Sequence, residues 1–400
     1  MSEVAARLTL QKDLARHLRA GHPWVFRKAV EKAPRGLEAG AIVDVVEGER
    51  FVARGYYDPL SAISVRILTR EPAEAIDAAF WSRRVQRALA LRRELVRGTN
   101  AFRMVHGESD GLPGVVADRY DRFAVVKLYS AGLGPHRAHI VEALRDAAGE
   151  LAGVYGRDEV PHDEEDEDAA PQGRVLWGAE PPERIAVDEH GMRLLVDVRR
   201  GQKTGTFLDQ RENRRLVREL AQGRGEALNC FSYTGGFSVA AALGGVKHVV
   251  SVDVDRDAIA LARDNFRENG LDPADHAFAA EDAFELLARY KREGRRFQLV
   301  ICDPPAFAKS QKAVEAAVAG YASLNRAALA VLAPGGLLVT ASCSARVSAE
   351  QFYDAVKEAA FKARVDLQLV EERRQPPDHP VSPQFREGRY LKCFVYRRVG

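Results

Sequence analysis

The stretch from Glu226 to Asp253 constrains the fold of this chain more than any other part of the sequence. A short apolar run leads into the loop Ser232-Tyr233-Thr234-Gly235-Gly236, a helix of small residues follows, and a second apolar run ends in Asp253. This order predicts strand, glycine turn, helix and strand, the unit that opens a doubly wound parallel sheet. A carboxylate at the tip of the second strand typically accepts hydrogen bonds from ribose hydroxyls, so the unit predicts an adenosine-cofactor site. The alternative is an α/β domain in which the two glycines only pack.

The turn also narrows the choice of cofactor. It lacks the G-x-G-x-x-G spacing that cradles a pyrophosphate, and no G-x-x-x-x-G-K-[ST] occurs in the 400 residues. A cofactor without phosphate groups is therefore favoured, and S-adenosylmethionine (SAM) fits that description. A nicotinamide-dependent oxidoreductase is disfavoured for the same reason.

The length of the chain predicts more than one domain, because 400 residues are more than a single core usually fills. Short alternating runs broken by glycines predict a small β-barrel in residues 1–72. An Arg-rich helix and further alternating runs predict an α+β domain in residues 73–190, with an acidic loop at 162–173. Strand and helix patterns alternate from residue 191 to residue 400, which predicts an α/β, doubly wound sheet with an added terminal hairpin.

Composition excludes several classes of protein. No apolar run approaches the roughly 18 residues that span a bilayer, so we expect a cytoplasmic protein with no membrane partner. The four cysteines form no Cys/His cluster, which argues against a disulfide framework and a metal site. Residues 1–105 hold 19 Lys and Arg against 12 Asp and Glu, although the net charge is only +2. This basic third favours a polyanion partner, and a solvated Arg-rich face is an equally supported alternative. A homodimer is left open.

A second chemical centre is predicted from two residues that follow apolar strands. Asp303 follows the run 298–302, and Cys343 follows the run 337–341. The carboxyl ends of parallel strands meet at one edge of a sheet, so we expect the two side chains to be neighbours. Strand alternation turns Cys302 to the opposite face, where it is expected to be a buried hydrophobe. A thiolate that adds to C6 of a pyrimidine makes C5 able to accept a methyl group, so Cys343 is predicted to be a nucleophile of this kind. The alternative is that Cys343 is an inert buried cysteine.

The motifs together resemble a known family. Five segments carry the likeness, and they are Asn229 to Phe237, Gln202-Lys203-Thr204-Gly205 with Leu208 to Arg211, Asp303 to Phe307, Ser342-Cys343-Ser344 and Asp378 to Val381. They are similar to the motifs of the RlmI-type family. Its members are class I SAM-dependent methyltransferases that make 5-methylcytosine in large-subunit ribosomal RNA. The likeness covers essentially the whole chain. The segments Gly21 to Phe26 and Ala53 to Ser61 resemble a PUA domain, an RNA-binding module.

The resemblance implies roles for individual residues. Cys343 would be the nucleophile, and Asp303 would hold the target base. In the cofactor site, Ser232 to Gly235 would contact the methionine part of SAM, Asp253 the ribose and Asp282 the adenine amine. The full implied cofactor set is Phe207, Asp209, Gln210, Phe231, Ser232, Tyr233, Thr234, Gly235, Asp253, Asp282 and Asp303.

Ribosomal RNA is the implied partner of the basic third. Arg54, Arg66 and Lys309 would contact it, with Tyr56 and Tyr57 as exposed stacking residues. Trp24 and Phe26 are expected in the core instead. The segment 202–211 is expected to be a lid over the cofactor or a plain β-hairpin.

Two other functions stay open at this point. Methylation of a guanine or adenine nitrogen would need no nucleophilic cysteine, and a non-catalytic RNA-binding or ribosome-assembly factor could keep the same fold. Related RNA cytosine-5 methyltransferases carry a second cysteine after their Asp-x-Pro motif, and here Ala306 stands in that place. The base that completes the reaction is therefore not identified by the motifs.

Overall fold

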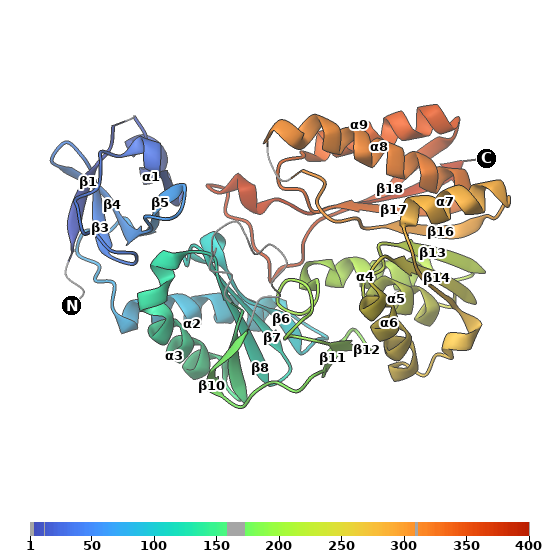
Figure 1. Ribbon diagram of the computed structural model, residues 1–400, viewed down its shortest axis with the longest axis horizontal. Helices are drawn as coiled ribbons and strands as arrows, with labels where there is room; N and C mark the ends of the chain where they lie inside the picture. Colours follow the sequence, from blue (N-terminus) through green and yellow to red (C-terminus); the bar gives the residue numbers. More distant parts are fainter. Residues whose placement is uncertain (1–3, 12, 158–172, 309–310, 400) are drawn as a thin grey trace. The chain divides into compact units, whose positions relative to one another are not determined.

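The computed structural model describes residues 4–11, 13–157, 173–308 and 311–399 (Figure 1). Lys309 and residues 162–172 of the predicted acidic loop lie outside this range. The chain divides into two compact units. The first comprises Met1–Val187, Val196–Leu208 and Pro377–Gly388, and the second comprises Asp188–Leu195, Asp209–Pro376 and Arg389–Gly400. Among the described residues, no helix is long and apolar enough to cross a membrane.

The first unit begins with a five-stranded sheet in the order β1-β3-β4-β5-β2. Its elements are β1 (Ala6–Thr9), α1 (Ala15–Arg19), β2 (Trp24–Phe26), β3 (Ile42–Glu47), β4 (Arg50–Tyr57) and β5 (Ile63–Thr69). β1 pairs with β3 in parallel, and the remaining pairs are antiparallel. The packing is close at Gly55 of β4, where a Cβ atom would lie 2.1 Å from the Arg66 carbonyl oxygen. This part is the small β domain that the sequence predicts.

A second five-stranded sheet, in the order β10-β9-β8-β7-β6, completes the first unit together with two helices. The elements are α2 (Ala78–Leu95), β6 (Ala101–His106), β7 (Val115–Tyr120), β8 (Phe123–Leu128), α3 (Arg137–Ala148), β9 (Gly153–Gly156) and β10 (Arg174–Gly178). The Asp77 carboxylate caps α2 by accepting a hydrogen bond from the Phe80 amide. Phe80, Trp81 and Val85 form the buried stripe of α2 against this sheet.

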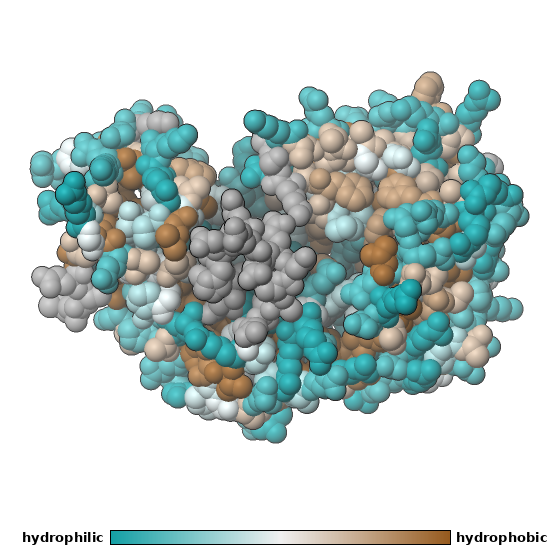
Figure 2. Space-filling model, in the orientation of Figure 1, coloured by the Kyte–Doolittle hydropathy of each residue, from teal (hydrophilic) through white to brown (hydrophobic). Residues whose placement is uncertain are grey.

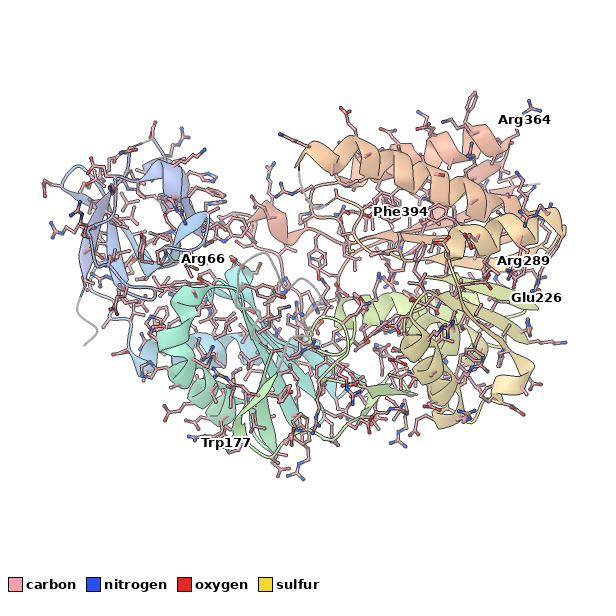
Figure 3. The ribbon with its side chains drawn as sticks, in the orientation of Figure 1. Arg66, Trp177, Glu226, Arg289, Arg364 and Phe394 are labelled. Atoms are coloured by element: carbon pink, nitrogen blue, oxygen red, sulfur yellow. The ribbon has the colours of Figure 1, made fainter. Side chains whose placement is uncertain are left out.

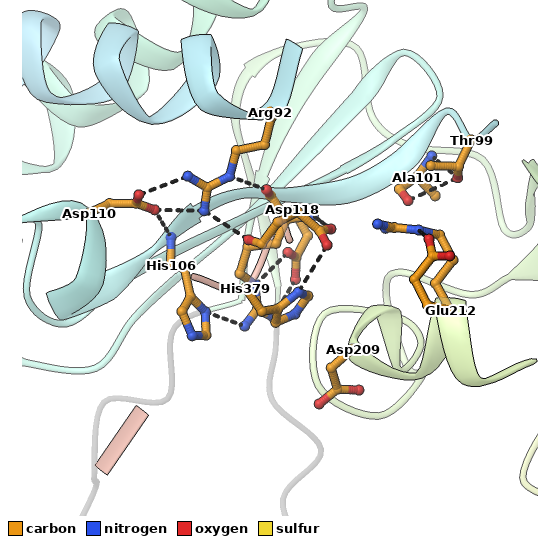
Figure 4. Close-up of polar contacts among 12 residues, drawn as sticks. Arg92, Thr99, Ala101, His106, Asp110, Asp118, Asp209, Glu212 and His379 are labelled. Atoms are coloured by element: carbon orange, nitrogen blue, oxygen red, sulfur yellow. Dashed lines mark hydrogen bonds and ion pairs between the residues drawn. The ribbon is translucent and has the colours of Figure 1, made fainter. Parts of the chain in front are cut away.

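Buried charges hold the segment 377–388 in the first unit. The Arg92 guanidinium makes two hydrogen bonds of 2.7 Å to the Asp110 carboxylate and donates a third to the Asp378 carbonyl oxygen (Figure 4). The Asp378 carboxylate accepts a hydrogen bond from the Arg103 amide, and the His379 ring lies 5.0 Å from that of His106. The Asp-His-Pro motif of the sequence is thus a packing element of the first unit.

The second unit contains a seven-stranded sheet in the order β15-β14-β13-β16-β17-β19-β18. Its strands are β13 (Glu226–Cys230), β14 (His248–Asp253), β15 (Ala277–Ala280), β16 (Phe297–Cys302), β17 (Leu332–Ser342), β18 (Asp366–Arg373) and β19 (Lys392–Val399). β19 runs antiparallel to both β17 and β18, and the other pairs are parallel. The α/β doubly wound sheet with a terminal hairpin is therefore confirmed.

Helices cover both faces of this sheet. They are α4 (Arg211–Leu220), α5 (Gly236–Leu243), α6 (Arg256–Glu268), α7 (Ala283–Arg292), α8 (Val314–Val331) and α9 (Ala349–Ala363). In Figure 1, α4, α5 and α6 lie on one face and α7, α8 and α9 on the other. Phe394, labelled in Figure 3, lies in the core between the sheet and the layer of α7, α8 and α9, with its ring centroid 5.3 Å from that of Phe352. A two-stranded sheet is formed by β11 (Ile185–Glu189) and β12 (Met192–Val196), of which residues Asp188–Leu195 belong to this unit.

The structure corrects several expectations for the basic third. Tyr56 is fully buried and donates a hydrogen bond to the Pro113 carbonyl oxygen, so it is no exposed stacking residue. Arg66 is also buried, with a 3.0 Å hydrogen bond to Ser130 (Figure 3). Arg54 is bonded to the Asp44 carboxylate at 2.7 Å. Phe26, expected in the core, is 47% exposed. Both arginines are thus held by internal contacts, which argues against their predicted role in binding RNA.

Candidate active site

The loop after β13 has the geometry of a ligand-binding turn. Phe231, Tyr233 and Gly235 have positive φ angles of 59°, 46° and 78°. A Cβ atom at Gly235 would lie 2.9 Å from the Ala262 Cβ, so this position requires glycine for space as well as for conformation. Two non-glycine residues in the left-handed region are strained, and such strain is concentrated at functional sites.

Polar groups of this loop are available to a ligand. The Ser232 hydroxyl is buried and has no hydrogen-bond partner within the described part of the chain. Asp253, at the end of the adjacent β14, accepts a 2.8 Å hydrogen bond from the Tyr233 amide. A buried hydroxyl without a partner is unfavourable, so a bound polar ligand would stabilise this loop.

Asp282 follows β15, the next strand of the sheet. Its carboxylate is exposed and caps α7 by accepting hydrogen bonds from the Phe284 and Glu285 amides. The predicted ribose and adenine residues therefore stand at the ends of neighbouring strands. The adjacent Phe284 ring packs edge-on against Phe231, with ring centroids 6.4 Å apart.

Two carboxylates, Asp209 and Asp303, form the next part of the site. Gln210 donates a 2.9 Å hydrogen bond to Asp303, and the Tyr390 hydroxyl donates one of 2.7 Å to Asp209. The other oxygen of Asp209 is buried without a partner among the described residues. Burial and the charge of Asp209 raise the pKa of Asp303 to about 7, against the smaller effects of Gln210 and Arg214. Asp303 can therefore either donate or accept a proton near neutral pH.

Cys343 lies directly after β17, between two anchored serines. Ser342 and Ser344 are both buried, and each is hydrogen-bonded to the Tyr321 hydroxyl, at 2.9 and 3.0 Å. Cys343 is half-buried, whereas the chain's other three cysteines are fully buried. Burial also raises the pKa of Cys393. Cys343 is the cysteine best placed to react.

A buried lysine stands beside this cysteine. Lys392 pairs with Ser342 across β17 and β19, and its side chain is 1% exposed. Its ammonium donates hydrogen bonds to the carbonyl oxygens of Ser344, Val347 and Tyr390 at 2.7, 2.8 and 2.8 Å. Burial lowers the pKa of Lys392 to about 8, and the charge of Cys343 acts in the opposite direction. The described contacts of this ammonium include no carboxylate, so a Cys343 thiolate would be its counter-ion.

Cys302 behaves as predicted. It is fully buried opposite Cys230 in the paired strands β13 and β16. A hydrogen bond with Cys302 and burial raise the pKa of Cys230 well above its ordinary value. Both thiols are packing groups.

Phe207 and the preceding segment belong to the first unit. Thr204 donates a hydrogen bond to the buried Asp118 carboxylate, and its hydroxyl also contacts that of Tyr120 at 2.9 Å. The expectation of a lid at 202–211 stays a prediction. Sequence reasoning missed Tyr390 and Lys392, because no local pattern marks the pairing of β19 with β17. The tripeptide Tyr390-Leu391-Lys392, at the start of an apolar run, is the signal that was available.

The chain matches known protein families and relatives over most of its length. Residues 132–397 match a family described as S-adenosylmethionine-dependent methyltransferase, and residues 8–70 match a PUA-like domain. Ribosomal RNA large subunit methyltransferase I from Salmonella paratyphi B is 41% identical over 98% of this chain and 97% of its own. The protein of that description from Salmonella typhimurium shows the same identity and coverage.

Solved structures are similar over nearly the whole chain. A protein described as a candidate methyltransferase complexed with SAH has a TM-score of 0.85 and 25% identity, covering 98% of this chain and all of its own. A candidate SAM-dependent methyltransferase from Streptococcus mutans gives a TM-score of 0.84 at the same identity and coverage.

Proposed function

Because the chain belongs to the S-adenosylmethionine-dependent methyltransferases, in the group of ribosomal RNA large subunit methyltransferase I, we propose that it methylates C5 of a cytosine in large-subunit ribosomal RNA. The observation that carries the proposal is Cys343, a half-buried thiol beside the buried ammonium of Lys392. Methylation of a purine nitrogen needs no such thiol.

The residues at the strand ends fit SAM. The unpartnered Ser232 hydroxyl and the strained loop around it suit the methionine part, and Asp253 suits the ribose hydroxyls. We assign Phe231 and Asp282 to the adenosine, and Asp209 and Gln210 to the methionine end. When bound, SAM supplies the electrophilic methyl group that an activated C5 accepts.

Cys343 and Asp303 would activate the base. The Cys343 thiolate adds to C6, and the electron pair of the C5–C6 double bond moves toward N3 and the exocyclic group. Asp303 in its protonated form donates a proton to N3, which neutralises the charge that develops there. Its pKa of about 7 keeps a substantial protonated fraction at neutral pH.

The second half of the reaction releases the product. After C5 carries the methyl group, a base removes the C5 proton, the C5–C6 double bond re-forms, and the Cys343 thiolate leaves C6 with its electron pair. The proton on N3 returns to the Asp303 carboxylate, which restores both the neutral base and the protonated acid. Lys392 stabilises the thiolate both before the addition and after the release. Ala306 cannot serve as the base, so the proton goes to another group or to water.

Mass spectrometry of nucleosides tests this proposal. Ribosomal RNA would be incubated with the purified chain and isotope-labelled SAM, and the label is expected in 5-methylcytosine. Cys343→Ala should abolish the label, while Cys302→Ala, a matched change of a buried thiol, should keep it. Label in a methylated purine would overturn the proposal, and so would full activity of Cys343→Ala.

A further inference from the structure

A basic groove lies on the outer side of the helical layer formed by α7, α8 and α9. Its volume is about 700 Å³. The floor is apolar, with Leu287 and Ala288 from α7 and Ala327 and Ala330 from α8. Its lining includes no carboxylate but five cationic side chains, which are Lys291, Arg296, Arg326, Lys362 and Arg398. In Figure 2, hydrophilic side chains gather at the end of this unit where α7 lies.

Most of these cations are not neutralised by the protein. Within the described residues, Lys362 is the one of the five that pairs with a carboxylate, Glu358, at 2.5 Å. The Arg398 guanidinium donates to the Leu332 carbonyl oxygen, and its Nε is buried without a partner among the described residues. Lys291 and Arg326 are exposed, with no carboxylate partner in the described part of the chain. Such a surface favours an anionic ligand with apolar or aromatic parts.

The groove is distinct from the site that binds the cofactor and the base. Arg296 precedes β16, and Asp303 follows it. Six residues of strand separate the two, which corresponds to about 20 Å. The cations therefore cluster toward the edge of the sheet opposite Asp303 and Cys343. At the other end of the groove, Phe284 contacts Phe231 of the cofactor loop.

We propose that this groove binds the phosphate backbone of the RNA substrate at a distance from the target nucleotide. The inference rests on the proposed function for the identity of the polyanion. Cationic side chains without carboxylate partners match phosphate groups, and the apolar floor and Phe284 match exposed bases. At the stacked rise of about 3.4 Å per nucleotide, about six nucleotides at most would separate the target from the cations, and an extended strand would need fewer.

The test measures RNA binding by the full chain at several salt concentrations. In the variant, Lys291→Glu and Arg326→Glu are combined. The control combines Lys247→Glu with Lys357→Glu, two exposed lysines outside the groove lining that give the same change in net charge. Two lost phosphate contacts should reduce the slope of log K against log salt by about 1.5, and the control should leave it unchanged.

The length of the RNA gives a second readout. The groove variant should bind and methylate an oligonucleotide of five nucleotides with the target in the middle like the wild type, because two flanking nucleotides are too short to reach from Asp303 to the cations. Its affinity should fall only for a fragment that extends at least about ten nucleotides beyond the target.

Three outcomes would overturn the inference. They are an unchanged salt slope on the long RNA, an equal loss in the control, and binding to anionic vesicles that disappears in the groove variant while RNA binding persists. Failure of the proposed function would look different, because the wild type would then bind the long RNA without forming 5-methylcytosine.

Discussion

Replacing Lys392 by Met tests whether the buried ammonium activates Cys343. Methionine keeps much of the volume and removes the charge, so the change isolates electrostatics from packing. The three carbonyl hydrogen bonds of 2.7 to 2.8 Å fix the ammonium at the end of β17. The other charge that acts on it, Arg374, has the same sign, so a Cys343 thiolate would be its compensating charge.

The size of the effect follows from the burial of the pair. A neighbouring opposite charge typically changes a side-chain pKa by about 1 to 3 units. We therefore expect the pH midpoint of Cys343 reactivity to rise by at least about one unit in Lys392→Met. One unit corresponds to about 1.4 kcal/mol, or about a tenfold smaller thiolate fraction below the midpoint.

Alkylation by iodoacetamide measures this directly, with neither RNA nor SAM present. The rate at Cys343 would be followed against pH by peptide mass spectrometry, and the three buried cysteines serve as unreactive internal references. Lys357→Met, a change of an exposed lysine on α9, is the control and should leave the profile unchanged. A folded Lys392→Met protein with the wild-type midpoint would refute the reasoning.

Three further predictions use the same structure. Asp303→Asn should lower the rate of methyl transfer by about 10²- to 10⁴-fold. In the wild type, the rate contribution of protonated Asp303 should be lost as the pH rises through about 7. A pH–rate profile that lacks this loss would contradict the role of Asp303 as a proton donor. Lys392 has a folded-state pKa of about 8, below the ordinary 10.5, so the unfolded chain binds more protons between these values. The free energy of unfolding should then rise by up to about 3 kcal/mol from pH 8 to 10.5, and urea titrations of Lys392→Met should lack that rise. Asp110→Ala leaves the buried Arg92 guanidinium without its carboxylate and should destabilise by about 3 to 5 kcal/mol. The exposed ion pair of Glu358 with Lys362 is the control, since Glu358→Ala should change the free energy of unfolding by less than about 1 kcal/mol. Equal losses of stability in Asp110→Ala and Glu358→Ala would contradict the argument from burial.

The sequence predicts where the candidate site residues lie in the fold because strand patterns are local. Asp253, Asp303 and Cys343 each follow an apolar run, and parallel strands bring such ends to one edge. Lys392 and Tyr390 were missed, because their place depends on the antiparallel pairing of β19 with β17. No period within one segment specifies such a pairing.

The errors in the basic third have another cause. Tyr56 lies on β4, whose two faces are both largely buried, and its hydroxyl bonds to Pro113 in the turn before β7 of the second sheet. Alternation predicts one buried and one exposed face, so it cannot predict the packing of a second sheet on the exposed one. The burial of Arg66 could not be predicted for the same reason, because its partner Ser130 lies 64 residues away in sequence.

The position of Asp378 has a consequence for the synthesis of this chain. Arg92 and Arg103, near the beginning of the first unit, both bond to Asp378, which is 275 residues beyond Arg103. At about 5 to 20 residues per second, a ribosome needs roughly 14 to 55 seconds to translate that interval. The first unit therefore cannot complete its core contacts until nearly the whole chain has been made. A nascent chain stalled before residue 377 should expose these arginines to proteases and chaperones, although most of its helices and strands have already been synthesised.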